Sequence, residues 1–578
     1  MFRRRDFLRS SALAAGGLAL GPAFWREALA QAAPTPGTAP YGPLGPPDPN
    51  GLMLPQGFTS RVVAQGQTPT SPSGYPWHVF SDGAATYPTP DGGWILVSNS
   101  ETPSAFGGGA SAMRFARDGE IQDAYRILGG TENNCAGGLT PYGTWLSCEE
   151  TDRGRVWECD PAGKHPAVVR EAMGVFKHEA ACVDQRGRRA YLTEDNGSSG
   201  FYRFTPPRYP FFGAGTLEIA TGTVPGRIAW VPIPDPLFTG DKSTFAQVPE
   251  AIRFRRGEGI WFDSGFVYVA TTSDDRVYVY DTSTETIEVL YDGAALGDVA
   301  PLHDVDNLTV HPASGDLFAG EDNDNLELCV LTVDRQIAPF ARLSGVQHQA
   351  ATAIPGLPDS DADSATSEVT GPAFNPDGTR LYFSSQRAFG VGAIYEVSGP
   401  FRRVRTPPAM QVVNPATGVR PPRDGDVLPE PPLGDLGPTP AGKGVRPLRL
   451  LAKPRLPLAA ARRRGLIATL EVDSPGTYEI ALVANFTPAR IRRGKRPRGR
   501  RRTVVLARAR RTVRAPGTVR LRLVLAPAAL RALRNRPETL RASLRARQLK
   551  GVGRGRRVTV PVALTVPPRS RRRGRRAS

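Results

Sequence analysis

The 578-residue chain has little of the residues on which several common kinds of site depend: five cysteines, six histidines and five methionines. The cysteines are odd in number and lack the spacing of a zinc ribbon, which excludes such a ribbon and leaves at least one thiol outside any disulfide. Among so few histidines no Ser-His-acid set stands out, which disfavours a serine nucleophile. Amphipathic stripes with a helical period are also scarce, and this argues against a helical protein.

No segment beyond the N-terminus is long and apolar enough to span a bilayer, which takes about 20 residues. The N-terminus has the pattern of a twin-arginine signal peptide: residues 4–8 read RRDFL, residues 12–20 are apolar, and residues 28–30 read ALA, a small-x-small cleavage site. We therefore expect residues 1–30 to direct export of the folded protein to the periplasm, the cell surface or the medium. In such a compartment one or two disulfides are possible.

The net charge of +18 conceals two parts of opposite sign. Residues 441–578 hold 39 lysines and arginines against four acids, whereas the first 440 residues hold 34 basic and 51 acidic residues. Such asymmetry indicates separate modules, of which the acidic one can hold hard cations and the basic one polyanions. Few aromatic residues accompany the basic ones, so we expect no nucleic-acid partner; anionic cell-envelope polymers or lipid headgroups fit better.

Turn-forming residues are abundant, since 62 glycines and 56 prolines make up about a fifth of the chain, and this favours a β protein. A weak repeat in the acidic part consists of a turn glycine, a short aromatic or β-branched strand, and a polar or acidic end. The six copies begin at Gly93, Gly143, Gly187, Gly265, Gly315 and Gly378 and end at Glu101, Glu150, Asp195, Asp275, Asp322 and Arg387. Most intervals approach the length of a four-stranded blade. The repeat predicts an all-β fold, a six-bladed β-propeller over residues 51–400, with its acids gathered at one mouth of the channel.

Composition divides the rest of the chain. Residues 31–50 are rich in Pro and Gly and are expected to be extended, and residues 401–444 read as a Pro-rich linker. In residues 445–566, Arg and Lys alternate in places with Val, Leu and Ala, which predicts a small basic β-sandwich of immunoglobulin-like type. Residues 567–578 are expected to form an Arg-rich disordered tail.

The residues best suited to chemistry lie at turns and strand ends of the predicted propeller. The densest group, residues 132–151, has Cys135 beside two asparagines and Glu150 at the end of the next strand. A soft thiolate beside hard carboxylates suits iron better than calcium alone. The structural alternative is a glycine-rich turn with a buried cysteine. Similar oxygen-rich groups, which suit calcium but also form ordinary turns, occur around Glu179, Glu194 and Glu321.

Arg256 and Glu258 form a further pair of interest. A planar guanidinium can clamp a phosphate while the neighbouring carboxylate holds a metal. A surface ion pair is the alternative interpretation of the same two residues.

Several motifs together resemble those of the PhoX family of secreted alkaline phosphatases. They include NNCAGG-x-TP-x-GTWLSCEE, F-x-HEA, YLTED, R-x-EG, DNLTVHP and TGPAFNPDGTRLYFSSQR, in the order and spacing typical of that family, over roughly residues 52–397. The resemblance implies a twin-arginine-exported, six-bladed propeller. It also implies hydrolysis of small phosphate esters at alkaline pH, at a cluster of Fe³⁺ and Ca²⁺ in the channel mouth.

By this resemblance, Cys135 is a thiolate ligand of iron rather than a nucleophile, Glu179 and Glu258 bind metal, and Arg256 binds the substrate phosphate. Further members of the metal site would be Glu150, Glu194 and Glu321. We expect a monomer.

The sequence departs from the PhoX pattern in two places. It reads NSE at residues 99–101, where relatives often have N-H-E, and it has no lysine just upstream of Cys135, where Arg126 is the basic residue. The alternative is a non-catalytic calcium-binding propeller that acts as an envelope binding or interaction protein.

Overall fold

The computed structural model describes residues 34–426, except 38–39, 71, 323–324, 334, 350–353 and 358–366, and eight strands between residues 449 and 565. The chain divides into two compact parts, Met1–Gly437 and Pro438–Ser578. The expected signal peptide (1–30), the end of the expected linker (427–444) and the expected tail (567–578) lie outside the described residues. Within the described residues, no helix has the length and apolar character of a membrane span.

The larger part is mostly β, with antiparallel modules of four strands in a propeller-like arrangement. The first module contains β4 (Ser81–Pro88), β5 (Trp94–Ser100), β6 (Gly109–Phe115) and β7 (Ile121–Gly129). The second contains β8 (Gly138–Leu139), β9 (Trp145–Cys148), β10 (Val156–Cys159) and β11 (Val168–Val169). The third contains β12 (His178–Asp184), β13 (Arg189–Glu194), β14 (Phe201–Thr205) and β15 (Thr216–Gly222), extended by β16 (Gly226–Pro232).

The fourth module contains β17 (Gly257–Asp263), β18 (Phe266–Thr271), β19 (Arg276–Asp281) and β20 (Thr286–Asp292), and β20 pairs briefly with β16. The fifth contains β21 (Val305–Val310), β22 (Leu317–Glu321), β23 (Glu327–Leu331) and β24 (Gln336–Leu343), with β1 (Thr35–Pro36) and β2 (Leu52–Met53) added on β24. The sixth contains β25 (Val369–Phe374), β26 (Arg380–Ser385), β27 (Ala393–Ser398) and, from far upstream, β3 (Thr59–Gln65).

Helical segments in the described residues are short. They comprise α3 (Gly293–Leu296) and the 3₁₀ turns Ser104–Phe106, Glu171–Met173, Phe245–Gln247, Gly297–Val299, Val346–Gln349 and Ala388–Gly390.

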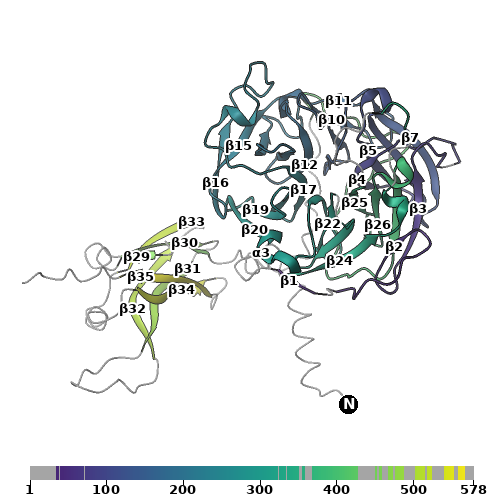
Figure 1. Ribbon diagram of the computed structural model, residues 1–578. Coiled ribbons are helices and arrows are strands. Elements are labelled where there is room, and N and C mark those ends of the chain that lie inside the picture. Colours follow the sequence, from purple (N-terminus) through teal and green to yellow (C-terminus); the bar gives the residue numbers. More distant parts are fainter. Residues whose placement is uncertain are drawn as a thin grey trace, which may run out of the picture. The chain divides into compact units, whose positions relative to one another are not determined.

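The six glycine-led repeats are confirmed as strands, and each is the second strand of its module: β5, β9, β13, β18, β22 and β26. The first strand of each module lies innermost, and the labels of β4, β12, β17 and β25 surround the middle of the larger part in Figure 1. These inner strands contact one another in a closed order, β4, β8, β12, β17, β21, β25 and again β4. A ring of this kind brings residues that are distant in sequence to a common axis.

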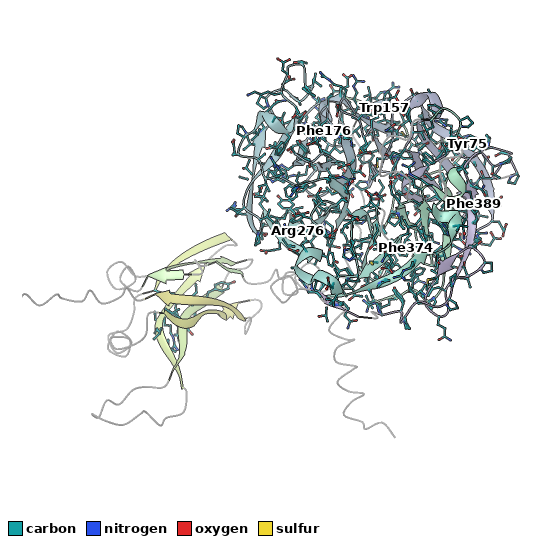
Figure 2. All side chains as sticks on the ribbon, viewed as in Figure 1. Tyr75, Trp157, Phe176, Arg276, Phe374 and Phe389 are labelled. Carbon is teal, nitrogen blue, oxygen red and sulfur yellow. The ribbon has the colours of Figure 1, made fainter. Side chains whose placement is uncertain are left out.

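Packing between neighbouring modules supplies the core. Ile95, Leu96 and Val97 of β5 are fully buried although they alternate between the two faces of the strand, because each face is covered by another module. Burying such a side chain stabilises the fold by about 1.5–3 kcal/mol. Side chains fill the space between the sheets throughout the larger part (Figure 2).

Residues 401–426, assigned to a linker from the sequence, are packed against the larger part and are called the C-terminal strap below. Arg402 and Arg405 each form an ion pair at 2.8 Å, and Val413 is fully buried. The strap forms hydrogen bonds with Asp316 of the fifth module and Asp263 of the fourth. It also forms hydrogen bonds with Pro88 of the first module and Asp160 of the second. It therefore ties together modules that are not neighbours in the sequence.

The smaller part has two sheets. One contains β28 (Arg449–Leu451), β30 (Leu466–Val472) and β33 (Gly517–Leu523). The other contains, in order, β29 (Arg455–Pro457), β35 (Arg557–Thr565), β34 (Thr539–Gly551), β31 (Gly476–Phe486) and β32 (Arg502–Val513). In β31, which lies between β34 and β32, Tyr478, Ile480 and Leu482 are fully buried at every second position, so one face of this sheet is apolar, as a two-layer arrangement requires.

Candidate functional site

A β-bulge interrupts the inner strand of five modules near its beginning. In each case two residues oppose one on the second strand, between the pairs Ser81/Ala84, His178/Ala181, Gly257/Ile260, Val305/Leu308 and Thr370/Ala373. In the second module, a break of similar kind separates the Asn134↔Glu149 bridge from β8. A bulge re-aims the side chain that it contains. The residues that occupy these irregularities, in module order, are Asp82, Cys135, Glu179, Glu258, Asp306 and Gly371.

These residues converge. The Cys135 thiol donates to Glu179 Oε1 at 3.2 Å. Donor atoms within 4.8 Å of one another form three overlapping groups: Asp82–Glu101–Cys135, Cys135–Glu150–Glu179 and Glu179–Glu258–Asp306. Because Cys135 and Glu179 are each shared by two groups, the three groups form one continuous cluster contributed by five modules.

Two further aspartates, Asp195 and Asp322, follow second strands and adjoin this cluster. Three cationic side chains also lie beside it: Lys177, Arg256 and Arg387. Lys177 lies 2.8 Å from Glu150 and 3.7 Å from Asp195. Arg256 lies 3.0–3.3 Å from Asp195, Glu258 and Asp322. The acidic cluster, as the term is used below, consists of Asp82, Glu101, Glu150, Glu179, Asp195, Glu258, Asp306, Asp322 and Glu368, with the cations Lys177, Arg256 and Arg387 beside it.

Buried polar side chains hold the cluster in place. The Gln386 amide donates to Asp82 at 2.9 Å and to Glu101 at 2.6 Å, so one side chain joins two carboxylates. The Asn99 amide donates to the backbone oxygens of Cys135 and Ala136 at 2.6 and 3.0 Å, which fixes the loop that carries the thiol. Asn99, which the NSE sequence shares with the N-H-E of the relatives, therefore has a structural role.

Burial and mutual repulsion weaken the acidity of the cluster. Burial raises the pKa of Asp82 to about 7, and the charge of Glu101 adds to this rise. Burial, followed by the neighbouring carboxylates, also raises the pKa of Glu179, Glu258 and Asp306 and of the Cys135 thiol. With every carboxylate ionised, nine negative charges would face three positive ones, an excess of six in the described residues. Protons or bound cations must balance this excess.

The donor set fits metal ions. Among the described residues, Glu179 Oε2 and Asp306 Oδ2 are buried without a hydrogen-bond partner, and an unpaired buried carboxylate oxygen is costly unless a cation contacts it. The thiol of Cys135 adds one soft ligand to otherwise hard oxygen ligands, a combination suited to iron alongside calcium.

A sequence model described as "Alkaline phosphatase PhoX" matches residues 85–388, just over half of the chain. The chain belongs to the PhoX family. As a PhoX alkaline phosphatase it is a phosphoric ester hydrolase. No curated protein matches the chain significantly.

Two solved structures are among those similar to this chain. Pseudomonas fluorescens PhoX in complex with vanadate, a transition state analogue, is 16% identical over 62% of this chain and 97% of that chain, with a TM-score of 0.49. The PQQ domain of pyranose dehydrogenase from Coprinopsis cinerea is 12% identical over 61% of this chain and 98% of that chain, with a TM-score of 0.35. Both TM-scores are below 0.5, so the family assignment rests on the sequence model.

The structure brings together most of the PhoX site residues expected from the sequence. Cys135, Glu150, Glu179 and Glu258 lie in the cluster, and Arg256 adjoins it. Two others have different partners. Glu194 accepts hydrogen bonds from Tyr202 and Gly200, and Glu321 accepts from the backbone of His303 and Glu327.

The adjacent residues Asp195 and Asp322 reach the cluster instead, because successive residues of a strand point to opposite sides. Two copies of the glycine-led repeat end at Asp195 and Asp322, so the repeat itself marks these two residues in the sequence. Asp82 was not anticipated, because the occupants of the bulges differ from module to module.

The basic residue upstream of Cys135 is not part of the site. Arg126 donates to the backbone oxygens of Leu128 and Gly108 at 2.8 and 2.9 Å. The lysine beside the acidic cluster is Lys177, which directly precedes β12 and is about one-third exposed. The site therefore has a lysine, although it does not come from the segment just upstream of Cys135, where the PhoX pattern places one.

Proposed function

We propose that this PhoX-family chain hydrolyses phosphate monoesters at the acidic cluster, with bound Fe³⁺ and Ca²⁺, at one end of a six-bladed propeller. The convergence of one thiol and buried carboxylates from five modules, two of them with unpaired oxygens, is the main support. Six glycine-led strands and the closed order of inner-strand contacts support six blades.

Cys135, Glu179, Glu258 and Asp306 would hold the metal ions, joined by Asp82. Iron and calcium, when bound, supply Lewis acidity toward phosphate oxygens and water. Cys135 acts as a ligand, since its thiol is buried and its raised pKa disfavours a free thiolate nucleophile.

Arg256 would orient the substrate phosphate at the edge of the cluster. Its backbone has a left-handed φ of 52° and is held by hydrogen bonds to Asn196 and Thr272, while its guanidinium is fixed by three carboxylates. A guanidinium that is already fixed can stabilise charge on the phosphate oxygens without reorganising.

Cys135→Ala tests this proposal, with Cys148→Ala as the matched control, because Cys148 is equally buried but lies in an apolar cluster. Both variants are measured for bound iron and calcium and for p-nitrophenyl phosphate hydrolysis at alkaline pH. We expect Cys135→Ala to lose iron and most activity and Cys148→Ala to keep both. Calcium without iron and without turnover in the unaltered protein would contradict the proposal and favour a non-catalytic binding protein.

We also propose that the protein is a monomer exported by the twin-arginine pathway and that its smaller part binds anionic envelope polymers or lipid headgroups. The excess of basic residues after residue 441 supports this binding. The full-length protein should be retained on anionic vesicles at low salt and released as salt rises, since screening weakens such contacts. Equal retention on neutral vesicles would contradict it.

A further inference from the structure

The sixth module breaks the pattern of the acidic cluster. Its bulge is occupied by Gly371, whose φ is +56°, and a Cβ at this position would lie 2.4 Å from the backbone oxygen of Asp82. A side chain at position 371 would therefore displace the first module. The second strand of the sixth module, β26, ends at Ser385 and is followed by Gln386 and Arg387, while the acid of the cluster in this module, Glu368, directly precedes the inner strand β25. The sixth module thus adds a cation, Arg387, after its second strand.

Arg387 differs from the other two cations of the site. Lys177 and Arg256 are engaged by carboxylates, whereas Arg387 forms no ion pair with any described residue, and its Nε is buried without a hydrogen-bond partner. Its positive charge still acts on the cluster, because it counteracts the rise in the pKa of Glu101, Glu368 and Asp322. A guanidinium has five N–H donors in a planar fork, and those of Arg387 form no hydrogen bond with any described residue.

The guanidinium is also held in place. Its central carbon lies 4.7 Å from the centre of the Phe80 ring, a cation–π contact. Phe80 has a strained φ of +47°, fixed by hydrogen bonds from its N–H to Val391 and from Glu101 to its oxygen. Strained residues of this kind are frequent at ligand clamps. The backbone of Arg387 donates to Ser367 at 2.9 Å, so both partners of the contact are anchored.

We propose that Arg387 binds the phosphate of the substrate and favours dianionic monoesters over monoanionic diesters. This inference rests on the proposed phosphatase function and adds a residue that determines its specificity. A pair of parallel N–H···O bonds matches two oxygens of a terminal phosphate. A cation interacts about twice as strongly with a dianion as with a monoanion at the same distance, so its removal penalises monoesters more.

The test compares Arg387→Gln and Arg387→Lys with the unaltered protein and with Arg227→Gln, whose side chain is 77% exposed in the third module. The measurements are KM and kcat for p-nitrophenyl phosphate and bis(p-nitrophenyl) phosphate, the inhibition constant of inorganic phosphate, and metal content. We expect Arg387→Gln to raise the monoester KM and the phosphate inhibition constant by about 10- to 100-fold, the range for a hydrogen bond to a charged group. The diester KM should rise less, and Arg387→Lys should recover part of the loss because it keeps the charge without the fork.

Unchanged phosphate inhibition in Arg387→Gln would overturn the proposal. So would equal losses for monoester and diester, or a loss of bound metal in parallel with affinity, because Arg387 would then only support the cluster. Calorimetric titration with inorganic phosphate separates this inference from the proposed function. Phosphate binding that weakens in Arg387→Gln, in a protein without turnover, would support the role of Arg387 while the phosphatase proposal fails.

Discussion

Removal of bound cations should destabilise the larger part of the protein, and increasingly so as the pH rises. The acidic cluster has nine carboxylates and three cations, and several of its members are fully buried. Without metal ions, the folded state must protonate some of these carboxylates or bear their repulsion. The unfolded chain bears neither cost, because water solvates its carboxylates.

Asp82 gives the size of the effect. Burial raises its pKa from 3.8 to about 7, so the folded protein binds this proton more tightly than the unfolded chain does. In the metal-free protein, the contribution of Asp82 to the free energy of unfolding is therefore largest below pH 4. It falls as the pH rises from about 4 to about 7. Three pKa units correspond to about 4 kcal/mol. A bound cation removes this loss, because it takes the place of the proton.

Urea unfolding followed by tryptophan fluorescence measures the prediction. All seven tryptophans lie at or before Trp261, so the signal reports the larger part alone. We expect protein treated with a chelator to lose several kcal/mol in free energy of unfolding between pH 5 and pH 8, and metal-loaded protein to lose much less. Equal stability of the chelated and loaded proteins at pH 8 would refute the reasoning, since the cluster would then be balanced without metal.

Three further predictions concern the scaffold, each measured by the same unfolding experiment. Gly259→Ala should destabilise the inner strand β17, because the added Cβ would lie 2.6 Å from the backbone nitrogen of Leu308. Gly197→Ala should be tolerated, because no atom lies within 4 Å of its Cβ position. Equal effects of the two substitutions would contradict the close approach at Gly259. His311 is buried with a pKa lowered to about 4, so stability should fall by up to about 3 kcal/mol as the pH drops from 7 toward 4, and less in His311→Gln. Arg170→Ala should lower the free energy of unfolding by about 3–5 kcal/mol, because it leaves the buried Glu158 carboxylate without its ion-pair partner. An accompanying Glu158→Leu should restore most of this loss, and no recovery would count against a charge effect.

The strands were predictable because their residues are constrained on both faces. A stretch such as residues 94–97 must be apolar throughout, and it must follow a turn glycine, so composition alone marks it. The convergence of Cys135, Glu179 and Glu258 could also be predicted, since their motifs resemble those of the PhoX family. In the smaller part, the alternation of basic and apolar residues also predicted strands.

The details that escaped prediction depend on one-residue shifts and long-range contacts. At two strand ends the sequence motifs indicated Glu194 and Glu321, whereas the next residues, Asp195 and Asp322, join the acidic cluster. Successive positions of a strand point to opposite sides of the sheet, so a shift of one residue moves a carboxylate to the other side. Glu321 lies in a separate buried group with Glu327 and Cys329 that could hold a metal ion. Asp82 lies in a bulge that leaves no sequence signal. Proline-rich composition marks residues 401–426 as irregular, but it does not tell whether an irregular segment is free or packed.

The C-terminal strap changes how the ring can come apart. The ring is closed at one seam by β3, which pairs with β27, and the strap crosses from the fifth and fourth modules to the first and second. Its contacts with Asp316, Asp263 and Pro88 lie at the ends of strands opposite to the bulges. If the β3–β27 pairing separates, the strap therefore still connects the fourth and fifth modules to the first and second. The chain should open slowly, and a version ended at residue 400 would keep every residue of the cluster yet have a shorter lifetime in the folded state.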